Sequence, residues 1–260
     1  MSCYNFIKLT FENGLFDKWI DMCYLLTMEN SNRCEMYTYQ LNKYKPFSTI
    51  IIQVNKGYKV CKKNLYKQST IQDLNESYLN VFQHARANNY NNIMILEDDF
   101  FFESIDIDIV NSIGKFINNN YYHIYNLGSL AHISIPSFDS HHRSLVLTTA
   151  HCVIYSSYYI DYYIDNYLDA MKSNPDLYWN KINIIKYKYY KPLCFQTFPT
   201  GENQNNWEIP KWFLKCAIFF IKLLKIDTMY QPGFTILNIL GYIPCTLFIV
   251  ITIYLIYRIY

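Results

Sequence analysis

The chain has 260 residues, of which 17% are charged and 18% aromatic, and its formal net charge is +2 at pH 7. This length allows one large or two small domains with a substantial core, and the low charge without a long basic face argues against nucleic acid as a partner. The 8 cysteines form no CxxC pair and no zinc-binding spacing, and the N-terminus shows no secretory signal, so we expect reduced, mostly buried thiols.

Apolar runs along the chain predict strands, and apolar residues spaced by three and four predict helices. In the first hundred residues, strands are expected at 6–11, 23–27, 48–54 and 93–96, and helices at 33–41 and 70–85, the latter opening with a capping box at 70–73. Beyond them, helices are expected at 105–117 and 160–171, and strands at 122–127, 145–155 and 191–196. The alternation predicts an α/β domain with a largely parallel sheet.

Three carboxylates follow directly on the apolar run at 93–96, namely Glu97, Asp98 and Asp99. Two carboxylates about 5 Å apart repel by roughly 3 kcal/mol at an effective dielectric near 20, so three in a row require a cation or hydrogen-bond donors opposite them. Ligands of open α/β sheets bind at the carboxyl ends of strands. Oxygen ligands suit Mg²⁺ or Mn²⁺, which keep positions open for substrate phosphates. The alternative is a solvated acidic turn.

Lysines and histidines gather in two further segments. One or two of the lysines between residues 56 and 67 would suit a nucleotide diphosphate, although a solvated loop is the simpler interpretation. The four histidines between 132 and 151 lack the spacing of a tetrahedral zinc site. We expect ordinary surface or core histidines there, with one of them a candidate to complete a metal site.

Several segments, taken in order, are similar to those of glycosyltransferase family 25, the lipopolysaccharide and procollagen galactosyltransferase group. They are CYLLTMENSNRCEMYTYQL, FQHARANNYNNIMILEDDF, YHIYNLG, LTTAHCVIYS, NPDLYW and KPLCFQTFPTGENQ. Together they span roughly residues 20–207, and the acidic strand end is the most specific of them. The chain departs from the family before that strand, where Asp73-Leu74-Asn75-Glu76-Ser77 replaces the usual Gly-Cys and Ser-His pattern.

The resemblance implies a GT-A fold, a Rossmann-type nucleotide-sugar-binding domain, that uses a UDP-sugar donor and a protein or glycan acceptor. Arg33 matches the family's loop arginine, and Glu97 and Asp98 are the candidates to contact the nucleotide. The resemblance places Mn²⁺ or Mg²⁺ on Asp99 together with Glu97, where the ion neutralises charge on the departing UDP.

Transfer with inversion also requires a base that takes the proton of the acceptor hydroxyl. The resemblance makes Asp176, in the Pro-x-Asp turn, the first candidate, and Glu202 follows in a polar segment. Two alternatives remain open: a transferase-like membrane scaffold without activity, and a Mg²⁺-dependent phosphotransfer enzyme. The phosphotransfer enzyme would need a second acidic strand end, which the sequence lacks.

The C-terminal part of the chain has the composition of a membrane anchor. Residues 236–257 carry no charge, and ~20 apolar residues suffice to span a bilayer. Before them, Lys211, Lys215, Lys222 and Lys225 form one stripe on an otherwise apolar helix, which is typical of a helix in the headgroup layer. Because only Arg258 lies beyond the span, we expect a tail-anchored protein with a cytosolic catalytic domain.

This organisation divides the chain into a glycosyltransferase-like domain at 1–209, an amphipathic interface helix at 210–235 and a transmembrane helix at 236–257.

Overall fold

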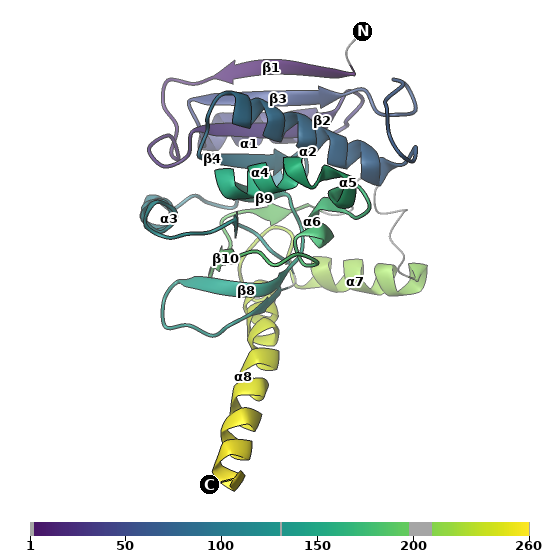
Figure 1. Ribbon diagram of the computed structural model, residues 1–260. Coiled ribbons are helices and arrows are strands. Elements are labelled where there is room, and N and C mark those ends of the chain that lie inside the picture. The colour runs from purple at the N-terminus through teal and green to yellow at the C-terminus, as the bar shows by residue number, and fades with distance from the viewer. Residues whose placement is uncertain (1–2, 131, 198–209, 260) are drawn as a thin grey trace.

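The computed structural model describes residues 3–130, 132–197 and 210–259. The first half contains β1 (Tyr4–Thr10), β2 (Met22–Met28), α1 (Cys34–Tyr44), β3 (Thr49–Asn55), α2 (Thr70–Ala87), β4 (Asn92–Glu97), β5 (Phe100–Phe101) and α3 (Ile107–Asn119). The second half contains β6 (Ile124–Asn126), β7 (His132–Ser134), β8 (His141–Leu147), β9 (Cys152–Ser156), α4 (Ser157–Asp165), α5 (Tyr167–Ala170), α6 (Pro175–Tyr178), β10 (Lys186–Tyr189), β11 (Phe195–Gln196), α7 (Lys211–Leu223) and α8 (Gly233–Ile259). Figure 1 shows α8 projecting from the domain.

A sheet of nine strands forms the centre of the domain, in the order β1-β3-β2-β4-β9-β6-β10-β8-β7. Strands β3, β2, β4, β6, β10 and β7 run in one direction, and β1, β9 and β8 run in the other. The expected α/β sheet is therefore confirmed, and most of its strands share one direction. It is nevertheless a mixed sheet, because the antiparallel β9 lies between β4 and β6.

Helices cover both faces of the sheet. On one face, α1 and α3 contribute Leu41 and Ile113 to a core with alternate residues of β2 and β4. On the other face, α2 and α4 contribute Phe82 and Tyr163, whose ring centroids lie 4.9 Å apart. Because β2 and β4 are buried on both sides, their sequences are continuously apolar, as predicted.

Three short strands, β5, β7 and β10, escaped prediction, and one predicted strand is shorter than expected. β10 reads Lys-Tyr-Lys-Tyr, a polar pattern, yet both of its lysines are buried. β7 has only three residues. The strand expected at 191–196 is confined to β11, which pairs with β5 outside the main sheet.

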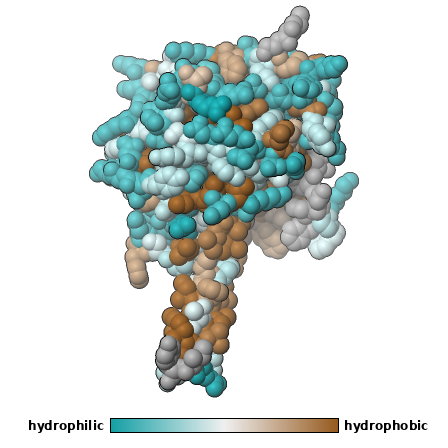
Figure 2. All heavy atoms as spheres, viewed as in Figure 1, coloured by the Kyte–Doolittle hydropathy of each residue, from teal (hydrophilic) through white to brown (hydrophobic). Residues whose placement is uncertain are grey.

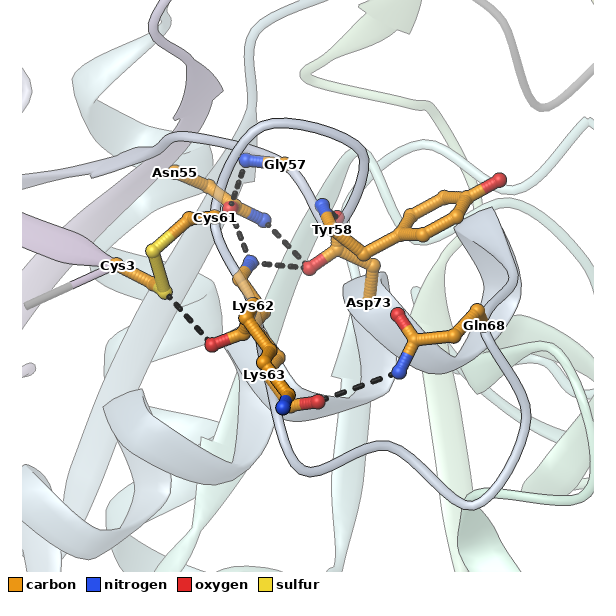
Figure 3. Close-up of a disulfide and its surroundings, with 9 residues drawn as sticks. All are labelled: Cys3, Asn55, Gly57, Tyr58, Cys61, Lys62, Lys63, Gln68 and Asp73. Carbon is orange, nitrogen blue, oxygen red and sulfur yellow. Dashed lines mark hydrogen bonds and ion pairs between the residues drawn. A yellow bond between two sulfur atoms is a disulfide. The ribbon is translucent and has the colours of Figure 1, made fainter.

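The capping box expected at 70–73 is shifted by one residue. Ser69 is the N-cap of α2, and its hydroxyl accepts a hydrogen bond from the backbone N–H of Gln72, because the backbone of Ser69 is extended. Asp73 therefore does not cap the helix. It is buried and binds Lys63, Asn55 and the N–H of Tyr58 instead (Figure 3).

The expectation of wholly reduced cysteines is wrong for one pair. Cys3 forms a disulfide with Cys61, across a Cα–Cα distance of 5.6 Å (Figure 3). Their separation of 58 residues gives no local signal. They meet because β1 pairs with β3, which places Tyr4 opposite Asn55. Of the free cysteines, Cys23, Cys152 and Cys194 are buried, as expected, whereas Cys34 and Cys216 are exposed and Cys245 is half-buried.

The two C-terminal helices expected from the sequence are present. Within the described residues, Gly233–Arg258 is long and apolar enough to cross a membrane, and only 11% of its most apolar window is buried. Figure 2 shows its apolar surface as a stalk below the domain. The helix is docked at its start, where Asn238 bonds the carbonyl of Tyr190, and Gly241 leaves room for the ring of His132.

Candidate functional site

The candidate site lies where the chain changes direction across the sheet. From β2 the chain crosses to β3 on one side, then returns to β4 on the other side of β2. The carboxyl ends of β2 and β4 are adjacent, with Leu26 opposite Glu97. In open α/β sheets, ligands bind at such a switch point. The acidic triplet therefore stands at the edge where open α/β sheets bind their ligands.

Donors from β2 and the loop that follows it hold the carboxylate of Asp98 in place. Its Oδ2 accepts hydrogen bonds from Thr27 Oγ1 at 2.9 Å and from Ser31 Oγ at 2.6 Å. Its Oδ1 accepts from Arg33 Nη1 at 3.0 Å. These contacts provide the opposing donors that the sequence requires for a row of acids. They also bring Arg33 to the edge of the site.

Asp99 is the most deeply placed of the three acids, with an exposed fraction of 4%. Its Oδ2 accepts from Gln196 Nε2 at 2.9 Å and lies 3.8 Å from Arg33 Nη1. Its Oδ1 is buried and has no hydrogen-bond partner among the described residues. Burial raises the pKa of Asp99, while the neighbouring His151 and Arg33 oppose that shift.

Glu97 faces helix α2, and its Oε1 accepts a hydrogen bond from the hydroxyl of Tyr78 at 2.9 Å. Burial raises the pKa of Glu97 to about 8, and the charges of Asp99 and Asp176 add to the rise, although the Tyr78 hydrogen bond and His151 lower it. Glu97 consequently holds its proton over most of the neutral range. It serves as a hydrogen-bonding acid there rather than as a third negative charge.

Asp176 comes to the same region from α6, where Pro175 occupies the first helical position. Burial raises the pKa of Asp176, while backbone N–H groups of Thr149, Asp176 and Leu177 lower it. Thr149 has a φ of +66°, a conformation that is costly for a β-branched residue and that accumulates at functional sites. A strained backbone therefore helps to hold this carboxylate, which lies near enough to Glu97 to raise its pKa.

One of the four histidines belongs to the site. His151 is fully buried, and its Nε2 lies 3.3 Å from the carbonyl of Cys194. Burial lowers the pKa of His151, but Cys194 and Asp99 raise it above its usual value. The other three are elsewhere: His141 stacks on Phe116, and His132 and His142 lie against α8.

The structure brings together five of the six predicted site residues: Arg33, Glu97, Asp98, Asp99 and Asp176. Glu202 lies outside the described residues. Of the lysines between 56 and 67, Lys63 is buried against Asp73 and Asn55 and so cannot meet a phosphate directly.

Four further contributors were not identified from the sequence: Thr27, Ser31, Tyr78 and Gln196. Thr27 and Ser31 flank the end of a predicted strand, which is the available signal for them. Tyr78 belongs to the apolar stripe of α2, and only its hydroxyl reaches the site. Gln196 meets Asp99 because β11 pairs with β5 directly after the acids.

The carboxylates do not form a complete metal cage by themselves. Within the described ranges, no group of three or more His, Cys, Asp or Glu side chains is arranged to hold an ion. The oxygen that remains for a metal is Asp99 Oδ1, which is buried without a hydrogen-bond partner there. Mg²⁺ and Mn²⁺ commonly bind one or two carboxylates together with substrate phosphates. Among the described residues, one carboxylate oxygen is therefore available to an ion, and the other ligands would have to come from outside this group.

Comparison with known proteins adds little. No protein-family model matches the sequence, and no curated protein matches it. The solved structure of A197 from STIV aligns with a TM-score of 0.42 at 10% identity over 68% of this chain and 85% of that one. A protein assigned as a glucose-1-phosphate thymidylyltransferase of Bacillus anthracis, in complex with sucrose, aligns with a TM-score of 0.37 at 10% identity over 66% and 69%. Neither likeness is close enough to carry an argument about function.

Proposed function

We propose that the chain is a membrane-tethered glycosyltransferase that transfers a hexose from a UDP-sugar to a protein or glycan acceptor with Mn²⁺ or Mg²⁺. The observation that carries this function is Asp99, buried at the switch point of the sheet with one carboxylate oxygen unpaired among the described residues. The resemblance of the acidic strand end and its flanking segments to glycosyltransferase family 25 supports the same assignment.

The donor would bind across the ends of β2 and β4. Arg33 is the cation at this edge, and it suits the diphosphate of a nucleotide sugar because a guanidinium matches phosphate oxygens. Asp98, fixed by Thr27 and Ser31, would accept a hydrogen bond from a ribose hydroxyl. An ion held by Asp99 would neutralise charge on the leaving diphosphate.

Asp176 is our candidate for the base that deprotonates the acceptor hydroxyl. Burial raises the pKa of Asp176, which makes its carboxylate a better proton acceptor near neutral pH, and backbone N–H groups keep it oriented. The neighbouring Glu97, whose pKa is about 8, retains its proton and so does not repel a second negative charge. Glu202 remains a second candidate base outside the described residues.

A transferase-like scaffold without activity is the alternative, and one observation favours it. The Arg33 side chain already contacts both Asp98 and Asp99, so the acids are partly neutralised within the protein itself. A scaffold would retain this arrangement without turnover. Nucleotide binding without hydrolysis of any UDP-sugar would therefore support the scaffold.

Two features, α8 and the helix before it, support membrane attachment. In α7, Trp212, Phe219 and Phe220 are exposed beside Lys211 and Lys215, as a helix in the headgroup layer requires. The lysines favour a cytosolic domain, whereas the Cys3–Cys61 disulfide persists best in an oxidising compartment. Maleimide labelling of the exposed Cys34 in sealed vesicles decides between them: protection from a membrane-impermeant reagent excludes the cytosolic orientation.

The activity is tested by incubating the purified full chain in neutral detergent with a panel of UDP-sugars, with Mn²⁺ and with EDTA. We expect slow hydrolysis of one donor that requires the metal. Asp176→Asn should reduce transfer to an acceptor and leave UDP binding intact. The absence of metal-dependent hydrolysis for every donor, with UDP still bound, would contradict the transferase and favour the scaffold.

A further inference from the structure

A cavity lies away from the acidic site, where α8 joins the domain. Its volume is about 400 Å³, within the range of small-molecule sites. Its walls come from the segment before β8, from the residue that follows β10 and from the beginning of α8. Four aromatic side chains contribute to the lining: Phe138, Tyr190, Tyr230 and Tyr242.

Three buried polar atoms in this lining have no hydrogen-bond partner among the described residues: His142 Nδ1, Thr235 Oγ1 and Tyr242 OH. His142 has an exposed fraction of only 7%. Leaving a buried polar atom unpaired is costly, and native proteins seldom do so without a ligand or water. All three groups are able to donate a hydrogen bond. Because all three residues line the same cavity, a ligand that accepts hydrogen bonds there would pair these donors.

A buried lysine lies directly behind this wall. Lys188 donates to Asn238 Oδ1 at 2.7 Å, and its Nζ lies 5.8 Å from the ring centre of Tyr242. Burial lowers the pKa of Lys188 to about 7. Burial and Lys188 also lower the pKa of His142, whereas Asp139 raises it. An anion in the cavity would stabilise the charged forms of both bases.

Charges of both signs lie near the cavity, beside the lining residue Tyr230. Lys191 lies 5.7 Å from the ring centre of Tyr230, and Glu103 accepts from the N–H of the same residue. Asp139 is exposed to solvent at the mouth. Solvent screens these rim charges more than the buried ones, so the interior donors and Lys188 decide the sign of the ligand.

The docking of α8 places this cavity beside the membrane surface. Asn238 donates to the carbonyl of Tyr190, and Gly241 lies against the ring of His132, so the start of α8 is held by the domain. The part of the apolar helix beyond residue 242 then remains for the bilayer. The cavity therefore lies at the boundary between the domain and the headgroup layer.

We propose that this cavity binds the phosphate-bearing headgroup of a membrane lipid, with His142, Thr235 and Tyr242 donating hydrogen bonds and Lys188 supplying the positive charge. The assignment relies on membrane insertion of α8, but not on the glycosyltransferase activity. The bound headgroup would lie at the junction between the domain and α8. A headgroup held there would fix the orientation of the domain on the bilayer.

The test is native mass spectrometry of the detergent-solubilised full chain with phosphatidic acid, with diacylglycerol of the same acyl chains, and with inorganic phosphate. We expect phosphatidic acid to bind and diacylglycerol to bind at least tenfold more weakly, because each hydrogen bond to a charged group contributes about tenfold. The double variant T235V/Y242F should lose at least tenfold in binding of phosphatidic acid. Its folding should be unimpaired, since neither hydroxyl has a partner within the described residues.

Lys188→Met should weaken binding similarly, and Lys186→Met is its matched control. Lys186 is a buried lysine of the same strand, but it donates to Trp179 and Asn180 away from the cavity. Equal binding of phosphatidic acid and diacylglycerol, or unchanged binding by T235V/Y242F, would overturn the site. Displacement of the lipid by equimolar phosphate would overturn the lipid assignment. Carbonate extraction and UDP-sugar hydrolysis, measured on the same sample, report separately on anchoring and on catalysis.

Discussion

Replacing Glu97 with Gln should change how the stability of the protein depends on pH. Burial, Asp99 and Asp176 raise the pKa of this carboxyl from 4.5 to about 8 in the folded state. Between these two values the folded chain holds more protons than the unfolded chain, so the free energy of unfolding falls as the pH rises. The slope for one such group is at most about 1.4 kcal/mol per pH unit.

From pH 5.5 to pH 7.5 the wild-type protein should therefore lose about 2–3 kcal/mol through this one group. Glutamine has the same shape and keeps an oxygen for the Tyr78 hydroxyl, but it has no charge to bury. Glu97→Gln should match the wild type only below about pH 4.5, already exceed it at pH 5.5, and exceed it by a further 2–3 kcal/mol at pH 7.5, which corresponds to roughly 2–4 °C in Tm for each kcal/mol.

Tryptophan fluorescence during thermal unfolding of the full chain, in one neutral detergent, measures this difference. Glu12→Gln is the matched control, because Glu12 is exposed and lies far along the sequence from the site. The reasoning is refuted if the difference in Tm between wild type and Glu97→Gln is the same at both pH values. A Glu97→Gln protein that is less stable than wild type at pH 7.5 would also contradict it.

Three further predictions concern the disulfide, the interface helix and the base. Cys61→Ser should cost about 4 kcal/mol of stability in the chain-entropy account of a loop of this length, and dithiothreitol should lower the Tm of the wild type but not of the variant. A chain ending at Lys225 should pellet with anionic vesicles at low salt and be released at high salt, because each lysine contributes about 1 kcal/mol to binding and salt screens charges within about 8 Å. A chain ending at residue 207 lacks these lysines and should not pellet. Equal pelleting of the two chains would contradict this prediction. Asp176→Asn should lower kcat for transfer at least a hundredfold with little change in UDP affinity, and unchanged transfer would exclude it as the base.

The sequence was sufficient to predict those strands and helices whose position depends on the pattern of apolar residues alone. The apolar run before Glu97 became β4, and the stripe that contains Val81 and Phe82 became the buried face of α2, because burial imposes these periods on the chain. β10 could not be predicted, since its two lysines are buried by tertiary contacts: Lys186 donates to the carbonyl of Trp179, and Lys188 donates to Asn238, which lies 50 residues away in the sequence.

In the candidate site, too, local sequence patterns could be predicted, whereas tertiary contacts could not. Three adjacent acids at a strand end were visible in the sequence, and their place at the switch point followed from the order of strands. The partners of the acids were not visible, because they depend on tertiary pairing. Gln196 reaches Asp99 only through the contact of β11 with β5, and Cys3 meets Cys61 only through the register of β1 on β3.

Asp99 Oδ1, which has no hydrogen-bond partner among the described residues, is the proposed metal ligand, and calorimetry of UDP binding tests this role. The full chain should bind UDP at least tenfold more tightly with Mn²⁺ than with EDTA, a difference of about 1.4 kcal/mol. Asp99→Asn should fold normally, because the substitution removes a charge from a crowded acidic cluster. Its affinity for UDP should be the same with and without Mn²⁺. Asp161→Asn, at an exposed position, is the control. A Mn²⁺ effect of the same size in Asp99→Asn and wild type would contradict the metal-dependent nucleotide site at the end of β4.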